Sequence, residues 1–389
     1  MESPEVLAGR RSLGSVQMRA RALLWLSATA LVCGFAPTPN GPVVGTVPGA
    51  LPPSFHYAYD DGYRGWPVSP LHREHPVRGS FLDPRGVDDT GTSGYHFGID
   101  VSVDDRTPDS GAPKGLSHAV YAVESGVVDR PSRDTTRSCI SRRLEVGHFD
   151  YWHVSPIVAQ GQRIRPGQQI GWSCLGAWHV HVSEWQLYRG ARVWVNPLHT
   201  GGKLVPYTDT AAPVVTTLAF RTPPRTAWSP KTSLRSPDSS RALEPTGLHG
   251  LVELRAKVAD PQSFLGFLAD DPAWPTEFSP YRITVLVRSV ARGTVVLRRT
   301  SFQADQLPQT PYIVHYAPGT IEDENMRECV GPPAHARCSG TYWFRPFSRF
   351  RHEYWNTRTV PNGSYVVTVD AYDIAGNVGS RTVTVVVAN

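Results

Sequence analysis

Two short segments, well separated in the sequence, place metal-ligand side chains in a strand-like pattern. In the first, apolar residues alternate with His96 and Asp100, and in the second, valines alternate with His179 and His181. Side chains point to opposite faces of a strand with a period of two. Both segments are therefore predicted to be strands that bury one face and turn the His/Asp face toward a common site. Two histidines and a carboxylate around an open position are typical of a catalytic zinc site.

The spacing within each segment limits how the ligands can meet. Residues two apart on a strand are separated by about 6.6 Å, so His179 and His181 can converge on one small site. Residues four apart, such as His96 and Asp100, are about 13 Å apart on a straight strand, which is long for two bonds of about 2 Å to one ion. The first strand is therefore expected to curve or bulge, and Gly98 between the two ligands permits this.

A fifth candidate, His153, lies between the two segments. A catalytic zinc usually takes three protein ligands, so two of the five candidates would be free for acid–base work and for stabilising charge in the transition state. His118, His148 and His199 belong to no such pattern and are interpreted as surface or structural residues.

The order His-x-x-x-Asp, Tyr-x-His, His-x-His resembles the lysostaphin/LytM-type zinc metallopeptidases, a family of peptidoglycan endopeptidases with the duplicated hybrid motif fold. The resemblance covers roughly residues 66–200. Four further segments are similar to the family's first strand, its A-x-x-x-G-x-V hairpin, its V-x-x-G-Q-x-I-G segment and its closing V-x-P, namely 75–81, 120–128, 164–171 and 195–197.

This resemblance implies one Zn²⁺ per chain, held by His96, Asp100 and His181. It implies that His153 and His179 are the catalytic pair that does not bind the metal. The implied reaction is hydrolysis of a peptide bond by a zinc-activated water, with the two histidines orienting the water and binding the developing oxyanion. The implied substrates are stem or cross-bridge peptides of peptidoglycan.

Three loops depart from the family's pattern and leave the substrate open, because the corresponding loops border the groove in the family. Two hypotheses therefore stand beside the first. One is a non-catalytic wall-binding or hydrolase-activating protein on the same fold, against which the five filled positions argue. The other is a zinc peptidase that acts on peptides outside the wall. The departing loops are 104–115, the stretch before His148 and the stretch between Gly171 and His179.

The whole chain has the composition of globular β domains. Its 389 residues are 40% hydrophobic and 19% charged, and 35 prolines and 34 glycines predict many turns. No segment keeps a helical period, so a mainly β fold is expected. The predicted order is a LytM-like antiparallel β-sheet peptidase domain (66–200), a linker (201–212) and an immunoglobulin-like β-sandwich (213–389).

The sandwich prediction comes from about seven short apolar or alternating runs separated by turn signals. Asn362-Gly363 is expected to enter the last hairpin and residues 373–377 to turn it. This ending resembles bacterial immunoglobulin-like repeats, which implies a spacer or a binding module with a wall polymer or protein as ligand. The runs are 214–220, 251–258, 282–287, 294–297, 342–344, 365–372 and 383–387.

Residues 1–36 are predicted to be an export signal or anchor, followed by a linker at 37–65. The apolar run 22–36 follows two arginines and is short for a spanning helix, which needs about 20 residues. Met18 directly precedes those arginines and is the hypothetical true start. We expect a secreted or envelope-associated protein that contacts membrane only through an uncleaved N-terminal segment.

The cysteines agree with export. Apart from Cys33 they form an even set, and local pairing of Cys139 with Cys174 and of Cys329 with Cys338 is the simplest of three connectivities. The sequence contains no Cys-x-x-Cys pair, so a zinc site built from thiolates is not expected. The net charge of +5 is spread along the chain; it favours anionic wall polymers and shows no pattern typical of nucleic-acid binding.

Overall fold

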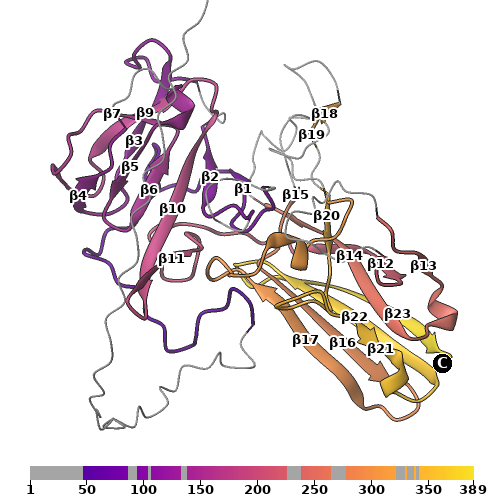
Figure 1. Cartoon of the computed structure of the whole chain (residues 1–389). Coiled ribbons are helices and arrows are strands. Elements are labelled where there is room, and N and C mark those ends of the chain that lie inside the picture. Colours follow the sequence, from indigo (N-terminus) through magenta and orange to yellow (C-terminus); the bar gives the residue numbers. More distant parts are fainter. Residues whose placement is uncertain are drawn as a thin grey trace, which may run out of the picture. The chain divides into compact units, whose positions relative to one another are not determined.

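The computed structural model describes residues 47–85, 94–103, 107–132, 138–225, 238–263, 277–320 and 341–389, and the backbone of 329–330 and 337–338. About 44% of the described residues lie in strands, which confirms the mainly β class; Figure 1 shows the strands. Helical structure in the described ranges is limited to 3-10 turns: η1 (Cys139–Ser141), η2 (Pro245–Gly247), η4 (Tyr312–Val314) and η5 (Thr357–Thr359).

The N-terminal β region, residues 66–200, contains two antiparallel sheets (Figure 1). The eight-stranded sheet has the order β1-β2-β10-β6-β5-β4-β8, with β11 paired to the second half of β10, and the three-stranded sheet has the order β3-β9-β7. The strands are β1 (Val77–Gly79), β2 (Ile99–Ser102), β3 (Leu116–Tyr121), β4 (Gly126–Asp129), β5 (Arg143–Val146), β6 (Phe149–Trp152), β7 (Val154–Pro156), β8 (Arg163–Ile164), β9 (Gln169–Cys174), β10 (His179–Tyr188) and β11 (Ala191–Val195).

The apolar faces predicted for the two ligand segments are buried. Ile99 and Val101 of β2 and Val180 and Val182 of β10 are all fully enclosed in the core. Because side chains alternate along a strand, this burial turns the intervening His and Asp residues to the other face. The core therefore sets the direction of the candidate ligands.

Residues 120–128 do not form the expected hairpin. β3 pairs with β9, whereas β4 pairs with β5 and β8, so the two strands that flank this turn belong to different sheets. The turn thus connects the two sheets of the N-terminal β region.

The C-terminal β region, residues 213–389, also contains two antiparallel sheets, and each of the seven predicted runs forms a strand in them. The six-stranded sheet has the order β13-β12-β14-β15, with β20 and β21 also paired to β14, and the four-stranded sheet has the order β17-β16-β22-β23. The strands are β12 (Val214–Arg221), β13 (Ala242–Leu243), β14 (Leu251–Pro261), β15 (Glu277–Phe278), β16 (Arg282–Ser289), β17 (Val295–Gln303), β20 (Tyr342–Phe344), β21 (Trp355–Asn356), β22 (Gly363–Tyr372) and β23 (Val378–Val387).

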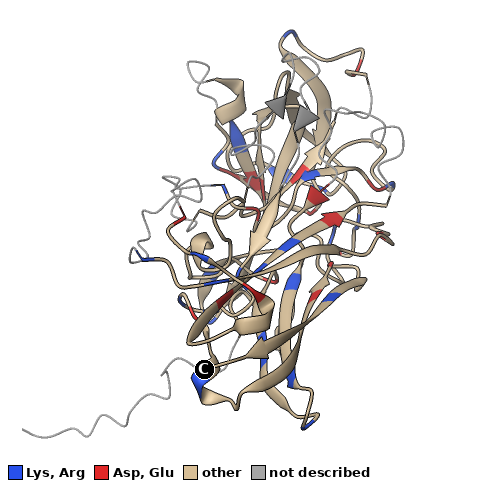
Figure 2. Ribbon diagram, turned by 90° about the vertical axis from the view of Figure 1, so that its right-hand side faces the viewer, with Lys and Arg blue, Asp and Glu red and all other residues tan. Residues whose placement is uncertain are grey.

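The last hairpin is confirmed. β22 and β23 pair from Gly363 opposite Val387 to Tyr372 opposite Val378, and residues 373–377 make the turn. Buried residues of both sheets, such as Leu254 of β14 and Val367 of β22, belong to the apolar core. Figure 2 shows basic and acidic residues interspersed along the strands.

Several predictions from the sequence lie outside the described residues. These are the export segment, the start at Met18 and part of the unusual loops of the N-terminal β region. The backbone strands β18 (Cys329–Val330) and β19 (Arg337–Cys338) pair with Cys329 opposite Cys338, and their side chains are not described.

Residues 47–65 are the described part of the predicted linker 37–65, and they contact the N-terminal β region. The hydroxyl of Tyr59 donates to Oε1 of Glu184 at 2.8 Å. Glu184 lies three residues after His181 in β10 and therefore on the opposite face of that strand. The Tyr59 contact is thus on the face that points away from the candidate site.

A buried histidine predicts how the stability of the C-terminal β region depends on pH. His315 is 1% exposed, and its Nε2 lies 2.9 Å from the hydroxyl of Thr310. Burial lowers the pKa of His315 to about 3, whereas an unfolded histidine titrates near 6.5. Because the unfolded chain then binds the proton more readily, stability is full above about pH 6.5 and falls by about 1.4 kcal/mol per pH unit as the pH drops toward 3.

The variant His315→Gln is expected to lose this contribution. Urea unfolding measured stepwise between pH 6 and pH 4 should show a slope of unfolding free energy that is shallower by about 1.4 kcal/mol per pH unit than in the parent chain. His249→Gln, at an exposed histidine of the same region, should keep the parent slope. An unchanged slope in His315→Gln would contradict the prediction.

Candidate metal centre

The antiparallel pairing of β2 with β10 brings three of the five predicted site residues together. The register places His181 directly opposite Asp100, with His179 two residues away on the same face. β6 pairs with the other edge of β10, with Trp152 opposite His181, and His153 follows Trp152 directly. Local alternation and strand register thus bring four of the candidates to one end of these strands.

His96 reaches the same place from outside the strand. β2 begins at Ile99, so the prediction of a continuous strand through His96 is wrong. The backbone N–H of His96 donates to the carbonyl of Asp83 at 2.7 Å, and its carbonyl accepts from the N–H of Leu82 at 2.9 Å. These bonds to the turn after β1 bend the chain, which removes the 13 Å separation expected for a straight strand.

Three side-chain atoms converge to form a potential metal site. Nε2 of His96 lies 2.7 Å from Nδ1 of His181, and Oδ1 of Asp100 lies 3.0 Å from Nδ1 of His181 and 3.2 Å from Nε2 of His96. Tetrahedral zinc with bonds of about 2.0–2.1 Å has ligand atoms about 3.3 Å apart. All three residues are buried. The donor set and its spacing therefore fit zinc.

Each of these residues is held by a second contact. Nδ1–H of His96 donates to the carbonyl of Ser80 at 2.8 Å, and Nε2 of His181 is hydrogen-bonded to the hydroxyl of Ser183 at 2.6 Å. Nη2 of Arg85 donates to Oδ2 of Asp100 at 2.7 Å. Such partners orient metal ligands and leave one atom of each free to face the metal.

The protonation states suit metal binding. Burial lowers the pKa of His181 to about 3, so its imidazole is neutral at pH 7. Burial alone would raise the pKa of Asp100, but His96, His179 and Arg85 together hold that pKa well below its usual range. Neutral imidazole and ionised carboxylate are the forms that bind metals.

Two glycines allow this close packing. A Cβ on Gly98 would collide with the carbonyl oxygen of Val182 and would come within 2.8 Å of Nε2 of His181. A Cβ on Gly79 would collide with the carboxylate of Asp100. Gly98 was expected to permit a bend in the strand; the structure shows that it also lets the backbone approach β10 closely.

His153 and His179 lie beside the three converging residues. Their ring centroids are 4.7 Å apart, and Nε2 of His179 is 3.4 Å from Oδ1 of Asp100. Nδ1–H of His153 donates to the carbonyl of Ile140 at 2.5 Å, which leaves the lone pair on Nε2. Burial, with a contribution from His179, lowers the pKa of His153 to about 4, so its Nε2 can accept a proton at neutral pH.

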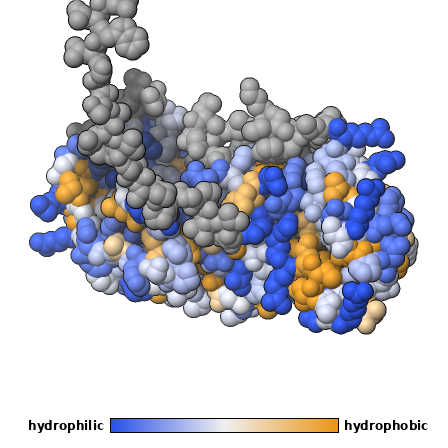
Figure 3. Space-filling model, turned by 60° about the horizontal axis from the view of Figure 1, so that its bottom comes forward, coloured by the Kyte–Doolittle hydropathy of each residue, from blue (hydrophilic) through white to orange (hydrophobic). Residues whose placement is uncertain are grey.

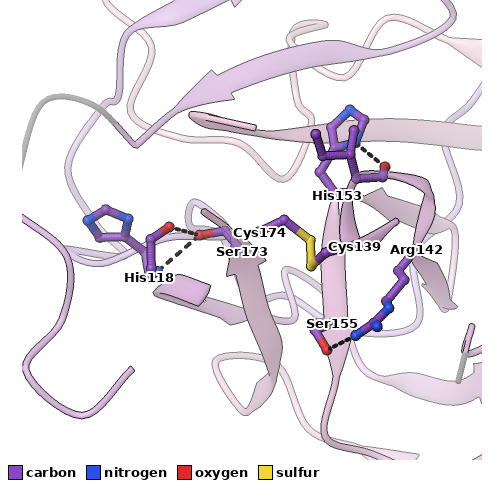
Figure 4. The surroundings of a disulfide bond; sticks show 9 residues. His118, Cys139, Arg142, His153, Ser155, Ser173 and Cys174 are labelled. Atoms are coloured by element: carbon purple, nitrogen blue, oxygen red, sulfur yellow. Dashed lines mark hydrogen bonds between the residues drawn. A yellow bond between two sulfur atoms is a disulfide. The ribbon is translucent and has the colours of Figure 1, made fainter. Parts of the chain in front are cut away.

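The disulfide between Cys139 and Cys174 confirms one predicted pair, and the two segments that it joins contact His153 (Figure 4). The bond joins η1 to the end of β9. The N–H of His153 donates to the carbonyl of Arg142 at 2.9 Å, and its carbonyl accepts from the N–H of Cys174 at 2.9 Å. The segment that contains Cys139 thus holds the ring of His153 through Ile140 and its N–H through Arg142. The segment that contains Cys174 holds the carbonyl of His153.

Removing this disulfide is therefore expected to weaken both stability and the position of His153. For cysteines 35 residues apart, the chain-entropy account gives a loss of about 3–4 kcal/mol in unfolding free energy for the double variant Cys139→Ser/Cys174→Ser. The hydrolysis expected from the sequence resemblance should fall about 10- to 100-fold, because His153, the base implied by that resemblance, would be misplaced. Zinc content should stay at the parent level, since none of the three converging residues lies on either segment.

Denaturant unfolding, zinc content and hydrolysis rate measured on the same preparation check this. The double variant Cys329→Ser/Cys338→Ser is the control, because it removes the other predicted pair and should keep the parent hydrolysis rate. Parent activity in Cys139→Ser/Cys174→Ser would contradict a positioning role for the disulfide.

The sequence did not reveal the supporting residues. Arg85, Ser80 and Ser183 carry no ligand pattern of their own, and only the fold places them next to the site. The histidines that were assigned structural roles make other contacts: His148 meets Glu124 at 3.0 Å, and His199 meets Glu184 at 3.3 Å. No family model matches the chain, and no match was found among curated proteins or among solved structures.

Proposed function

We propose that this chain is an exported zinc metalloendopeptidase of the lysostaphin/LytM type that hydrolyses stem or cross-bridge peptides of peptidoglycan. The observation that carries the proposal is the convergence of His96, Asp100 and His181 within bonding range of one ion, next to two further histidines. A second pair of histidine rings directly beside a His/Asp cluster is more typical of a catalytic centre than of a purely structural one.

In this proposal each residue of the chain has a distinct task. His96, Asp100 and His181 hold the ion, which when bound supplies the Lewis acidity that activates water and polarises a peptide carbonyl. His153 accepts a proton at Nε2, because its Nδ1–H is engaged by the carbonyl of Ile140. His179, adjacent to both His153 and Asp100, is positioned to stabilise the developing oxyanion.

Solvent-exposed residues next to the site support access by a large substrate. Trp178, directly before His179, is 50% exposed, and Leu175 in the same turn is 57% exposed. Exposed aromatic and aliphatic side chains beside a polar centre are a common feature of peptide-binding grooves. We assign Trp178 a role in substrate contact.

The C-terminal β region is proposed to be an immunoglobulin-like spacer or wall-binding module. Its two packed antiparallel sheets are compatible with that role. Figure 3 shows several apolar areas among polar ones on one face of the molecule. The exposed apolar side chains of the C-terminal β region include Val290 and Val378, each about half exposed. The ligand of this region is proposed to be a wall polymer or a protein of the envelope.

Export is supported by the disulfide, since such bonds persist in oxidising compartments. In the part of the chain that the structure describes, no helix has the length and apolar character needed to cross a membrane. The proposed location is outside the cytoplasm, secreted or held at the cell envelope.

Two measurements on the protein without residues 1–36 test the proposal. The first is zinc content after purification, which is expected to be one ion per chain. The second is the release of amines from insoluble peptidoglycan, compared with digestion of soluble peptides of the same sequence. Zinc together with wall digestion supports the proposal. Digestion of soluble peptides alone would favour a peptidase of other substrates, and absence of zinc would favour a non-catalytic binding protein.

A further inference from the structure

A second group of metal-ligand side chains lies outside the His/Asp centre. It consists of Asp209 in the segment 201–212, Asp260 near the end of β14 and Asp373 directly after β22. Each residue offers one carboxylate oxygen, and the three oxygens lie within 4.8 Å of one another. Three separate parts of the chain therefore bring carboxyl groups to one place, and this arrangement is unfavourable for three ionised carboxylates unless something compensates their charge.

Hydrogen bonds favour the ionised form of two of these carboxylates. Oδ1 of Asp209 accepts from the N–H groups of Ala211 and Ser263, each at 3.0 Å. Asp373 accepts from Asn377 at both oxygens, from the backbone N–H at 2.8 Å and from Nδ2 at 2.6 Å. Such bonds favour the charged form of a carboxylate, although burial still raises the pKa of Asp373.

Asp260 differs from them at one of its two carboxyl oxygens. Although the residue as a whole is half-buried, its carboxyl group is enclosed by protein and Oδ1 has no hydrogen-bond partner. Within the described ranges, no Lys or Arg forms an ion pair with any of the three carboxylates. Asp209 and Asp260 also line a cavity of about 40 Å³ together with Tyr207 and Gln262, which is room enough for an ion or one water.

A hard divalent cation would explain both the proximity of the three carboxyl groups and the missing partner of Asp260 Oδ1. Its charge would balance the carboxylates, and it would bind Oδ1 of Asp260. The donor set contains only oxygen, which calcium prefers. Calcium also accepts irregular coordination, whereas magnesium demands a near-ideal octahedron and is rarely bound by a set of protein carboxylates alone.

We propose that Asp209, Asp260 and Asp373 bind one Ca²⁺, which ties the segment 201–212 to the C-terminal β region. Water would complete the coordination, as it does in many calcium sites. The role is structural: the ion stabilises the place where the chain enters the C-terminal sheets. The sequence indicates only a hairpin turn at residues 373–377, and the proposal adds that this turn supplies the calcium ligand Asp373.

The test uses the full chain without residues 1–36, freed of metals with a chelator and titrated with calcium chloride alone at neutral pH. Calorimetry should show one calcium per chain. At calcium about 100-fold above its dissociation constant, the unfolding temperature should rise by about 5 °C. In Asp260→Asn, calcium binding should be at least about 10-fold weaker and the rise in unfolding temperature should be lost.

Without calcium, Asp260→Asn is expected to be no less stable than the parent chain. In chelator, Asp260→Asn replaces a buried carboxyl group by a neutral amide of similar size and should unfold at the parent temperature or above it. Asp370→Asn is the matched control. Asp370 lies in β22, three residues before Asp373, and is half-buried. Its Oδ1 accepts a hydrogen bond from the hydroxyl of Ser380 at 2.7 Å. Asp370→Asn should keep the full calcium response.

Three results would overturn the proposal. One is a parent chain whose unfolding temperature does not respond to calcium. Another is an equal calcium response in the parent and in Asp260→Asn. The third is an Asp260→Asn chain that is less stable than the parent in chelator, because this would show that the carboxylate has a partner within the protein. None of these readouts depends on the His/Asp centre, so the proposed function can fail or stand independently.

Discussion

Alanine at His181 is expected to remove the proposed zinc ion, whereas alanine at His153 is expected to leave that ion bound and to abolish most of the proposed hydrolysis. His181 contributes Nδ1 to the converging atoms, 3.0 Å from Oδ1 of Asp100, so its loss leaves two ligands, fewer than a stable site needs. His153 lies beside the site and is the proton acceptor of the proposed reaction, and loss of such a group typically costs about 10²- to 10⁴-fold in rate.

Zinc content and hydrolysis must be measured together to separate the two roles. His181→Ala should lose both, and His153→Ala should lose only hydrolysis. His56→Ala, at an exposed histidine in the same part of the chain, should lose neither. Full zinc occupancy with full activity in His181→Ala would show that the site has been assigned incorrectly, and loss of zinc in His153→Ala would make that residue a ligand.

Alanine at Gly98 is expected to be nearly as damaging as loss of a ligand, although glycine has no functional group. The added Cβ would overlap the carbonyl oxygen of Val182 and would come within 2.7 Å of the hydroxyl of Ser183. Relief requires β2 to move away from β10, which separates Asp100 from His181. Since overpacking costs about 1–3 kcal/mol and misplacement by about 1 Å costs about 100-fold in rate, both stability and zinc affinity should fall.

Gly111→Ala is the matched control for this variant. A Cβ on Gly111 meets nothing within 4 Å, so zinc content and unfolding temperature should stay at the parent values. Zinc titration of the chelated protein, with thermal unfolding of the same sample, measures both quantities. Parent zinc affinity in Gly98→Ala would mean that β2 and β10 tolerate a wider separation than the site geometry allows.

Much of the fold follows from local patterns. The seven runs of the C-terminal β region form strands because alternating and β-branched residues suit a half-buried strand whatever their partner. The same alternation placed Asp100 and His181 on the polar faces of their strands, and the core confirms it through Val101 and Val180. The pairing of Cys139 with Cys174 was also the simplest choice from the sequence.

The predictions that were wrong, for His96 and for residues 120–128, have a common physical cause. His96 was expected within a strand, but its backbone bonds Leu82 and Asp83, partners from another part of the chain. β3 and β4 were expected to pair with each other, yet long-range partners take both strands into different sheets. Propensity describes what a segment can form, and tertiary hydrogen bonds decide which of these options is adopted.

By itself, the sequence determined which residues could bind a metal and which faces of their strands they would occupy, because side-chain direction along a strand is a local property with a period of two. Only the tertiary structure decided that His181 lies opposite Asp100, that Arg85 bonds the carboxylate of Asp100, and that Asp209, Asp260 and Asp373 meet. These contacts depend on register and turn placement, which are set by packing between distant segments and leave no mark on the local pattern of either segment.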